Sequence, residues 1–230
     1  MIGMLLAIAC TAVVLFAGEY LWRKRILKGE YARKFVHINA ATIAAFWPLI
    51  MTRLQIVILS VLCMVVLVAV KQLNIFRSLR GVRRSTYGEL WYAIGIGLSA
   101  VVFKENAIYT IAILHMALAD GFAAIVGVGM GKKAKNFTYN GARKSIEGTL
   151  TFVVVSFFLN ATYWLYFSGH QSQLSGVSPL IIPLYSIVCA MTLSVAEVVA
   201  PRGSDNVIIP MLAGALLWVP YAALSFFAII

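Results

Sequence analysis

Charged residues are scarce in this sequence. Only 12% of its 230 residues are Asp, Glu, Lys or Arg, whereas 62% are hydrophobic and the mean hydropathy is +0.91. Soluble domains carry about 25% charged residues. The composition therefore excludes an ordinary soluble domain and predicts an integral membrane protein.

Cysteine is also rare. Cys10, Cys63 and Cys189 all lie in apolar runs and show neither the pairing of a disulfide framework nor the spacing of a zinc site, so we interpret them as packing residues. The first apolar run has no positively charged segment before it and no small-residue cleavage pattern after it. We therefore expect a retained helix there rather than a cleaved signal peptide.

Acidic residues number only eight against 19 Lys and Arg, which leaves a net charge of +11. A basic chain can bind nucleic acid, but here the basic residues form short clusters between apolar segments and no soluble domain is available to build a groove. We therefore expect no nucleic-acid partner and attribute the charge to membrane topology.

The apolar segments predict an all-α, polytopic membrane protein of one domain, residues 1–230, with about eight transmembrane helices. Seventeen of the 19 basic residues fall in loops on one side, and only Arg53 and Lys104 fall on the other. The positive-inside rule makes the basic side cytoplasmic and places both termini outside. The predicted spans are 1–21, 36–52, 54–70, 88–103, 107–130, 146–167, 179–200 and 207–229.

One basic loop has a pattern of its own. In "KQLNIFRSLRGVRR", residues 71–84, apolar and basic residues alternate at close to helical spacing. This pattern is typical of an interfacial helix on anionic headgroups, and a solvated positive loop explains it equally well.

Most acidic residues fall at one depth near the cytoplasmic side. Asp120 lies in the inner half of the fifth span, Glu147 begins the sixth, Glu197 ends the seventh, and Asp205 with Asn206 opens the eighth. An intramembrane carboxylate is costly unless it is paired, ligated or facing water, so each is a candidate functional residue. Their common depth predicts a shared site.

Asp120 also begins a helical face of small residues. Ala123, Ala124, Gly127 and Gly131 follow it at helical spacing, and Lys132 and Lys133 end the segment. Such a face allows close approach of either another helix or a phosphate chain. For the glycines alone helix packing is the favoured interpretation, but packing does not require the carboxylate.

Two further segments have the parts of an anion or metal site. "KSIEG", residues 144–148, begins a helix whose free N–H groups, with Lys144 and Ser145, suit an anion, although Ser145 also suits a plain N-cap. "PRGSDNVIIP", residues 201–210, brings Arg202 and the Asp205–Asn206 pair to another helix start. A standard phosphate loop is excluded, because Val126 and Lys133 stand where it needs Gly and Ser or Thr.

Together these segments resemble a known family. Asp120, Ala123, Gly127, Gly131 and the lysine pair, followed by "KSIEG", are similar to the DxxAxxxG…G…KK…K[ST]xEG signature of the CTP-dependent lipid kinases, which include dolichol kinase, phytol kinase and yeast-type diacylglycerol kinase. "RKFVH", residues 33–37, and "EVVAPRGSDNVIIP", residues 197–210, resemble the other two elements of that family. The lysine pair departs from the pattern, because it follows Gly131 directly.

The resemblance implies transfer of the γ-phosphate of CTP to the hydroxyl of a membrane lipid, which could be a polyprenol, phytol or diacylglycerol. The implied site faces the cytosol at the cell membrane. Phosphoryl transfer needs carboxylates for Mg²⁺, cations for phosphate oxygens and a base. The metal ligands would be Asp120, Asp205 and Asn206. The phosphate contacts would come from Arg33, Lys34, Gly127, Gly131, Lys132, Lys133, Lys144, Ser145 and Arg202. The base would be Asp120, Glu197 or His37, and Glu147 would ligate metal or orient Lys144.

Two other functions compete with this one. The CDP-lipid synthases share a similar DxxA…G…K[ST]xEG stretch, but they carry a basic SxxKRxxGxKD element near the C-terminus where this chain has "APRGSDN". A transporter or scaffold could also use cytoplasmic charges. A transporter commonly shows inverted repeats, and no convincing internal repeat is present.

Overall fold

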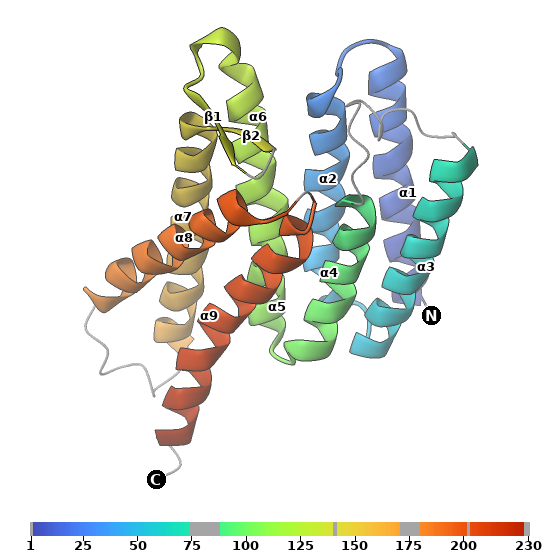
Figure 1. Cartoon of the computed structure of the whole chain (residues 1–230). Coiled ribbons are helices and arrows are strands. Elements are labelled where there is room, and N and C mark those ends of the chain that lie inside the picture. The colour runs from blue at the N-terminus through green and yellow to red at the C-terminus, as the bar shows by residue number, and fades with distance from the viewer. Residues whose placement is uncertain (1, 74–87, 140–141, 171–179, 202, 228–230) are drawn as a thin grey trace.

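The computed structural model in Figure 1 describes residues 2–73, 88–139, 142–170, 180–201 and 203–227. The predicted all-α architecture is confirmed, with one small addition: a two-stranded antiparallel hairpin between the fifth and sixth predicted spans. The helices are α1 Ile2–Arg23, α2 Glu30–Ala45, α3 Arg53–Leu73, α4 Gly88–Val102, α5 Asn106–Leu114, α6 Asp120–Gly129, α7 Ile146–His170, α8 Ile181–Val199 and α9 Asp205–Phe227. The strands are β1 Asn136–Tyr139 and β2 Ala142–Ser145.

Four helical stretches of the described chain are long and apolar enough to cross a membrane: Ile2–Arg23, Asn106–Gly129, Ile146–Tyr166 and Ile181–Val199. Three shorter apolar helices cover Arg53–Ala69, Gly88–Val102 and Asp205–Pro220. Helices therefore occupy the eight predicted positions, while the eight-span count and the outward termini stay predictions.

The second helix begins earlier than the sequence predicted. Helix α2 starts at Glu30, directly after Gly29 with φ 54°, rather than near residue 36. Arg33, Lys34 and His37, which the sequence placed in or beside a loop, therefore lie within its first turns. At 16 residues, α2 is also shorter than the roughly 20 residues that a full span requires.

The stretch from α5 to α6 is central to the bundle. These helices are joined by one π-helical turn, His115–Ala119, and together they contact α2, α4, α7 and α9. Within the most apolar window of this stretch 56% of the residues are buried, against 17% for α1. Residues of this stretch can therefore meet side chains from several helices.

Two hydrophobic clusters stabilise the arrangement. The larger one contains Trp47, Phe103, Tyr109 and Trp164. It packs α5 against residues of α2, α3, α4 and α7. The smaller one, which includes Phe152, Leu193 and Ile209, lies where α7, α8 and α9 meet the central stretch. In Figure 1 both termini lie at one end of the bundle, and the hairpin and the α1–α2 connection lie at the other.

Candidate functional site

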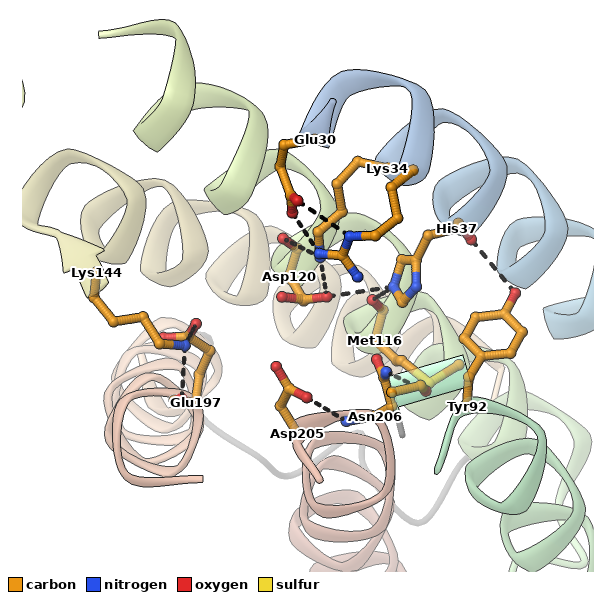
Figure 2. Close-up of polar contacts among 12 residues, drawn as sticks. Glu30, Lys34, His37, Tyr92, Met116, Asp120, Lys144, Glu197, Asp205 and Asn206 are labelled. Carbon is orange, nitrogen blue, oxygen red and sulfur yellow. Dashed lines mark hydrogen bonds and ion pairs between the residues drawn. The ribbon is translucent and has the colours of Figure 1, made fainter. Parts of the chain in front are cut away.

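Asp120, the first residue of α6, is held by two side chains of α2 (Figure 2). Lys34 Nζ lies 2.5 Å from Asp120 Oδ2 and 3.4 Å from its backbone carbonyl oxygen, and His37 Nε2 lies 3.3 Å from the same Oδ2. All three side chains are buried. Lys34 and His37 are three residues apart, which places them on the same face of α2.

His37 has further contacts that define its orientation. Its Nε2 donates to the carbonyl oxygen of Met116 at 2.9 Å, because a carbonyl can only accept. Its ring packs against Tyr92 of α4 with centroids 5.0 Å apart, and the Tyr92 hydroxyl donates to the His37 carbonyl at 3.4 Å. A neutral His37 therefore carries its proton on Nε2 and its accepting lone pair on Nδ1.

Lys144 and Glu197 form a second ion pair. Lys144, on β2, contacts the Glu197 carboxylate and lies 3.1 Å from the Glu197 carbonyl oxygen, in the last turn of α8. Burial alone would lower the pKa of Lys144, but the charge and hydrogen bond of Glu197 outweigh it and raise that pKa. A lysine at the C-terminal end of a helix is also favoured by the helix dipole.

Asp205 and Asn206 begin α9 beside these pairs. Asn206 is anchored, because its Nδ2 donates to the Gly88 carbonyl of α4 at 2.9 Å. Helices α4 and α9 approach so closely here that a Cβ on Gly95 would lie 2.1 Å from the Asn206 carbonyl oxygen. Asp205 accepts the backbone N–H of Asn206 at 3.1 Å.

The charged groups of the two ion pairs share one electrostatic site with Asp205. Asp205 interacts by charge with Asp120, Lys34 and Lys144, and Lys144 interacts with both aspartates. In Figure 2 the side chains of Asp120, Lys144 and Asp205 extend toward a common region between α6, α8 and α9. The structure thus brings together carboxylates and cations that are far apart in the sequence.

Glu147 points elsewhere. Both of its carboxylate oxygens accept the backbone N–H of Lys135 at 3.1 Å, at the base of the β1–β2 hairpin. The residue that contacts Lys144 is Glu197, not Glu147. The predicted alternatives for Glu147, a metal ligand or the orienter of Lys144, have no contact in support, and its observed role is to attach the hairpin to α7.

Ser145 and Gly127 contribute to packing between α6 and α7. Ser145 Oγ accepts the backbone N–H of Gly148 at 3.1 Å, which is N-cap geometry for α7. A Cβ on Gly127 would lie 2.8 Å from Ser145 Oγ, and one on Gly148 would lie 2.8 Å from the Ala123 carbonyl oxygen. The small residues therefore permit a close helix contact, as the packing interpretation expects.

Among the remaining predicted phosphate contacts, the lysine pair lies apart from Asp120. Lys132 and Lys133 are exposed in a 3₁₀ turn, Gly131–Lys133, after α6 has risen roughly 13 Å from Asp120. Gly131 does not continue the small-residue face, because α6 ends at Gly129 and Gly131 has φ 52°. Arg33 lies closer to the site, because it pairs with Glu30 at the start of α2 and also interacts by charge with Asp120 and Asp205. Arg202 lies outside the described residues, as does the basic segment 74–84.

Magnesium fits this site only together with phosphate oxygens. Within the described part of the chain, no three Asp, Glu, His or Cys side chains converge to enclose a metal. Mg²⁺ in nucleotide sites commonly uses one or two carboxylates plus substrate phosphates and water. Asp120 and Asp205, whose charges interact, meet that lower requirement.

Sequence reasoning missed two contacts in this site. It grouped Lys34 with the phosphate contacts, whereas the structure pairs Lys34 with Asp120, and it did not connect Lys144 to Glu197. The three-residue spacing of Lys34 and His37 could have indicated a shared helical face. Nothing in the sequence indicated which carboxylate that face would meet.

Comparison with known proteins gives one relative. The chain is 31% identical over 217 residues to a phytol kinase from Synechocystis sp., and the alignment covers 93% of this chain and 89% of that protein. No protein-family model matches the chain. No solved structure matches it either.

Proposed function

This chain belongs to the phytol kinase family, and we propose that it transfers the γ-phosphate of CTP to the hydroxyl of a membrane lipid at the cytoplasmic face of the cell membrane. The observation that carries the proposal is the convergence of Asp120, Asp205, Lys34 and Lys144 on one site between buried helices. Phytol is the first acceptor to test because the relative is named for it, and polyprenol and diacylglycerol follow.

The two lysines differ in access, which suggests different roles. The Lys144 side chain is 20% exposed and comes from a hairpin at the end of the bundle, whereas Lys34 is 3% exposed. We therefore assign phosphate binding to Lys144 and the orientation of the Asp120 carboxylate to Lys34. A phosphate oxygen that replaces Glu197 at Lys144 Nζ would gain a charge-assisted hydrogen bond.

Asp120 and Asp205 are the proposed magnesium ligands. When bound, Mg²⁺ would neutralise charge on the phosphate oxygens. Asn206 would contribute less directly, because its Nδ2 already holds α9 to α4. Its position next to Asp205 suits it to fix the start of α9.

The proposed general base is His37. Its Nε2 is held by Met116 and Asp120, so a neutral imidazole offers Nδ1 to a lipid hydroxyl. The other two candidates are already engaged in ion pairs, Glu197 with Lys144 and Asp120 with Lys34.

The test is a labelling experiment with the purified full chain, Mg²⁺ and a panel of lipid alcohols and lipid phosphates. CTP is supplied with the label on either the γ or the α phosphorus, and ATP serves as the competing donor. We expect γ label in the lipid fraction, with phytol among the acceptors and CTP preferred over ATP.

The other outcomes separate the alternatives. Label transferred from the α position to a lipid phosphate would identify a CDP-lipid synthase. Absence of both transfers, together with no measurable CTP binding, would overturn the enzyme proposal and favour a transporter or scaffold. Asp120→Asn is the negative control for each transfer.

A further inference from the structure

The helix that carries Asp120 is interrupted directly before it. In the π turn His115–Ala119, the backbone N–H of Asp120 donates to the carbonyl of His115, five residues back. A π turn holds one residue more than the α-helical turn that it replaces. Without it, α6 would be rotated by about 100° around its axis relative to α5. The direction of the Asp120 carboxylate therefore depends on this turn.

His115, the first residue of the turn, is tied to α7 by a buried hydrogen bond. Its side chain is completely buried, its Nδ1 lies 2.8 Å from the Ile111 carbonyl oxygen, and its Nε2 lies 3.2 Å from Nδ2 of Asn160. Asn160 Nδ2 also lies 2.8 Å from the Ser156 carbonyl oxygen, which requires the amide nitrogen at that position. Nδ2 is therefore the donor to His115, and His115 is the neutral form with its proton on Nδ1.

Met116, the second residue of the turn, is held from the opposite side. Its carbonyl oxygen accepts the hydrogen bond from His37 Nε2 of α2. Two successive residues of the π turn are thus fixed by side chains from two different helices. Buried polar groups in an apolar bundle are costly unless they are hydrogen-bonded, so these contacts favour one arrangement of the turn.

We infer that His115 and Asn160 are positioning residues that hold the π turn and thereby direct the Asp120 carboxylate toward Lys34 and His37. Within the described part of the chain, neither residue hydrogen-bonds the Asp120 carboxylate, and both act through the backbone between His115 and Asp120. Their effect on turnover rests on the proposed lipid kinase function, whereas their effect on the orientation of α6 does not.

A disulfide can report that orientation without any activity measurement. A Cβ placed on Gly121, the residue after Asp120, would lie 3.8 Å from Cβ of Ile38 on α2. This separation is typical of disulfides. The atoms that would crowd the new side chain, Cγ1 and Cδ1 of Ile38, are removed when Ile38 becomes cysteine. The Ile38→Cys/Gly121→Cys pair, with the three native cysteines replaced by serine or alanine, should therefore cross-link readily under mild oxidation.

The test adds His115→Phe or Asn160→Leu to that cysteine pair in the detergent-solubilised full chain. Each removes the hydrogen bond between α7 and the π turn while retaining apolar volume, and we expect the cross-linking rate, followed by mass spectrometry, to fall at least about tenfold. That change corresponds to about 1.4 kcal/mol. His115→Gln should retain part of the rate, because its Oε1 can still accept from Asn160.

Ser156→Ala is the matched control. Ser156 is also completely buried on α7, and its Oγ has no hydrogen-bond partner among the described residues, so this variant should cross-link at the parental rate. Parental rates in His115→Phe and Asn160→Leu would overturn the inference, as would an equal loss in Ser156→Ala. Both variants break the hydrogen bond between His115 and Asn160, and His115→Phe also removes the contact of His115 with the Ser156 backbone, so Asn160→Leu is the more specific of the two.

Turnover provides the second readout. If the wild-type chain transfers γ label, the same variants should lower kcat with little change in KM for the nucleotide. If the wild-type chain transfers no label, the proposed function fails while the cross-linking result still tests the π turn.

Discussion

The Lys34–Asp120 and Lys144–Glu197 ion pairs have the same chemistry but different surroundings. In the first, the side chains are 3% and 8% exposed, both partners lie on helices, and His37 is a third member. In the second, the lysine is 20% exposed and comes from a hairpin. We therefore expect the first pair to contribute to both folding and chemistry, and the second to contribute mainly to ligand affinity.

Asp120→Asn should have the largest effect. We expect turnover to be lost, because Asp120 is the proposed metal ligand. The free energy of unfolding should also fall by about 3–5 kcal/mol, because Lys34 is left buried without its counter-charge. Label transfer and thermal unfolding in detergent measure the two effects. Lys34→Met/Asp120→Leu should recover stability but not activity, and wild-type turnover in Asp120→Asn would remove this residue from the mechanism.

His37→Gln tests the histidine that contacts Asp120 beside Lys34. Glutamine can still donate to the Met116 carbonyl, but it lacks the accepting ring nitrogen. We expect kcat to fall by about 10²- to 10⁴-fold, the usual contribution of a general base, with KM for CTP nearly unchanged. Steady-state kinetics across a range of CTP concentrations measures both. An unchanged kcat would assign the base to another residue.

The second pair is tested by Lys144→Ala. We expect KM for the nucleotide to rise about tenfold, which corresponds to about 1.4 kcal/mol, with a smaller loss of stability than in Asp120→Asn. Arg143→Ala is the matched control, because Arg143 is the preceding residue of β2, points to the other face of the hairpin and is exposed. Equal effects of the two substitutions would indicate general electrostatic attraction rather than a specific contact.

The smallest effect concerns a more exposed pair, Glu30–Arg33. Burial would raise the pKa of Glu30, but the hydrogen bond and charge of Arg33 outweigh it and hold that pKa below its usual value of 4.5. Its stabilising contribution is therefore present above pH 4.5 and is lost as the pH falls through the lowered value. For a partly exposed pair this amounts to at most about 1 kcal/mol.

Thermal unfolding of Glu30→Gln and wild type at several pH values measures that contribution. The difference in Tm should be largest at neutral pH and should shrink below pH 4.5. A difference that stays constant across this range would show that the Glu30 charge is not its source.

The positions of the helices were predictable because apolar runs have one stable form in a bilayer, in which the backbone satisfies its own hydrogen bonds. The start of α2 was not predictable. Arg33 and Lys34 have the charge that is typical of a loop, and the sequence does not show that Lys34 pairs with a carboxylate. The hairpin does have a sequence signal, because Asn140–Gly141 between two short polar segments is typical of a two-residue hairpin turn.

The candidate site was predictable in part. Asp120, Lys144, Glu197 and Asp205 were each identified, since charges near apolar segments require a partner. Their pairing was not predictable, because Asp120 and Lys34 are 86 residues apart and Lys144 and Glu197 are 53 apart. The roles of these residues in phosphoryl transfer stay predictions.

Apolar helices with a few charges at a common depth could be predicted from the sequence, because composition and spacing set burial and helical periodicity. The folded chain was needed to see which cation meets which carboxylate, that Glu147 contacts the hairpin rather than Lys144, and that a π turn precedes Asp120. These outcomes depend on contacts between helices and on a shift of one residue in hydrogen bonding, and local sequence patterns do not encode either.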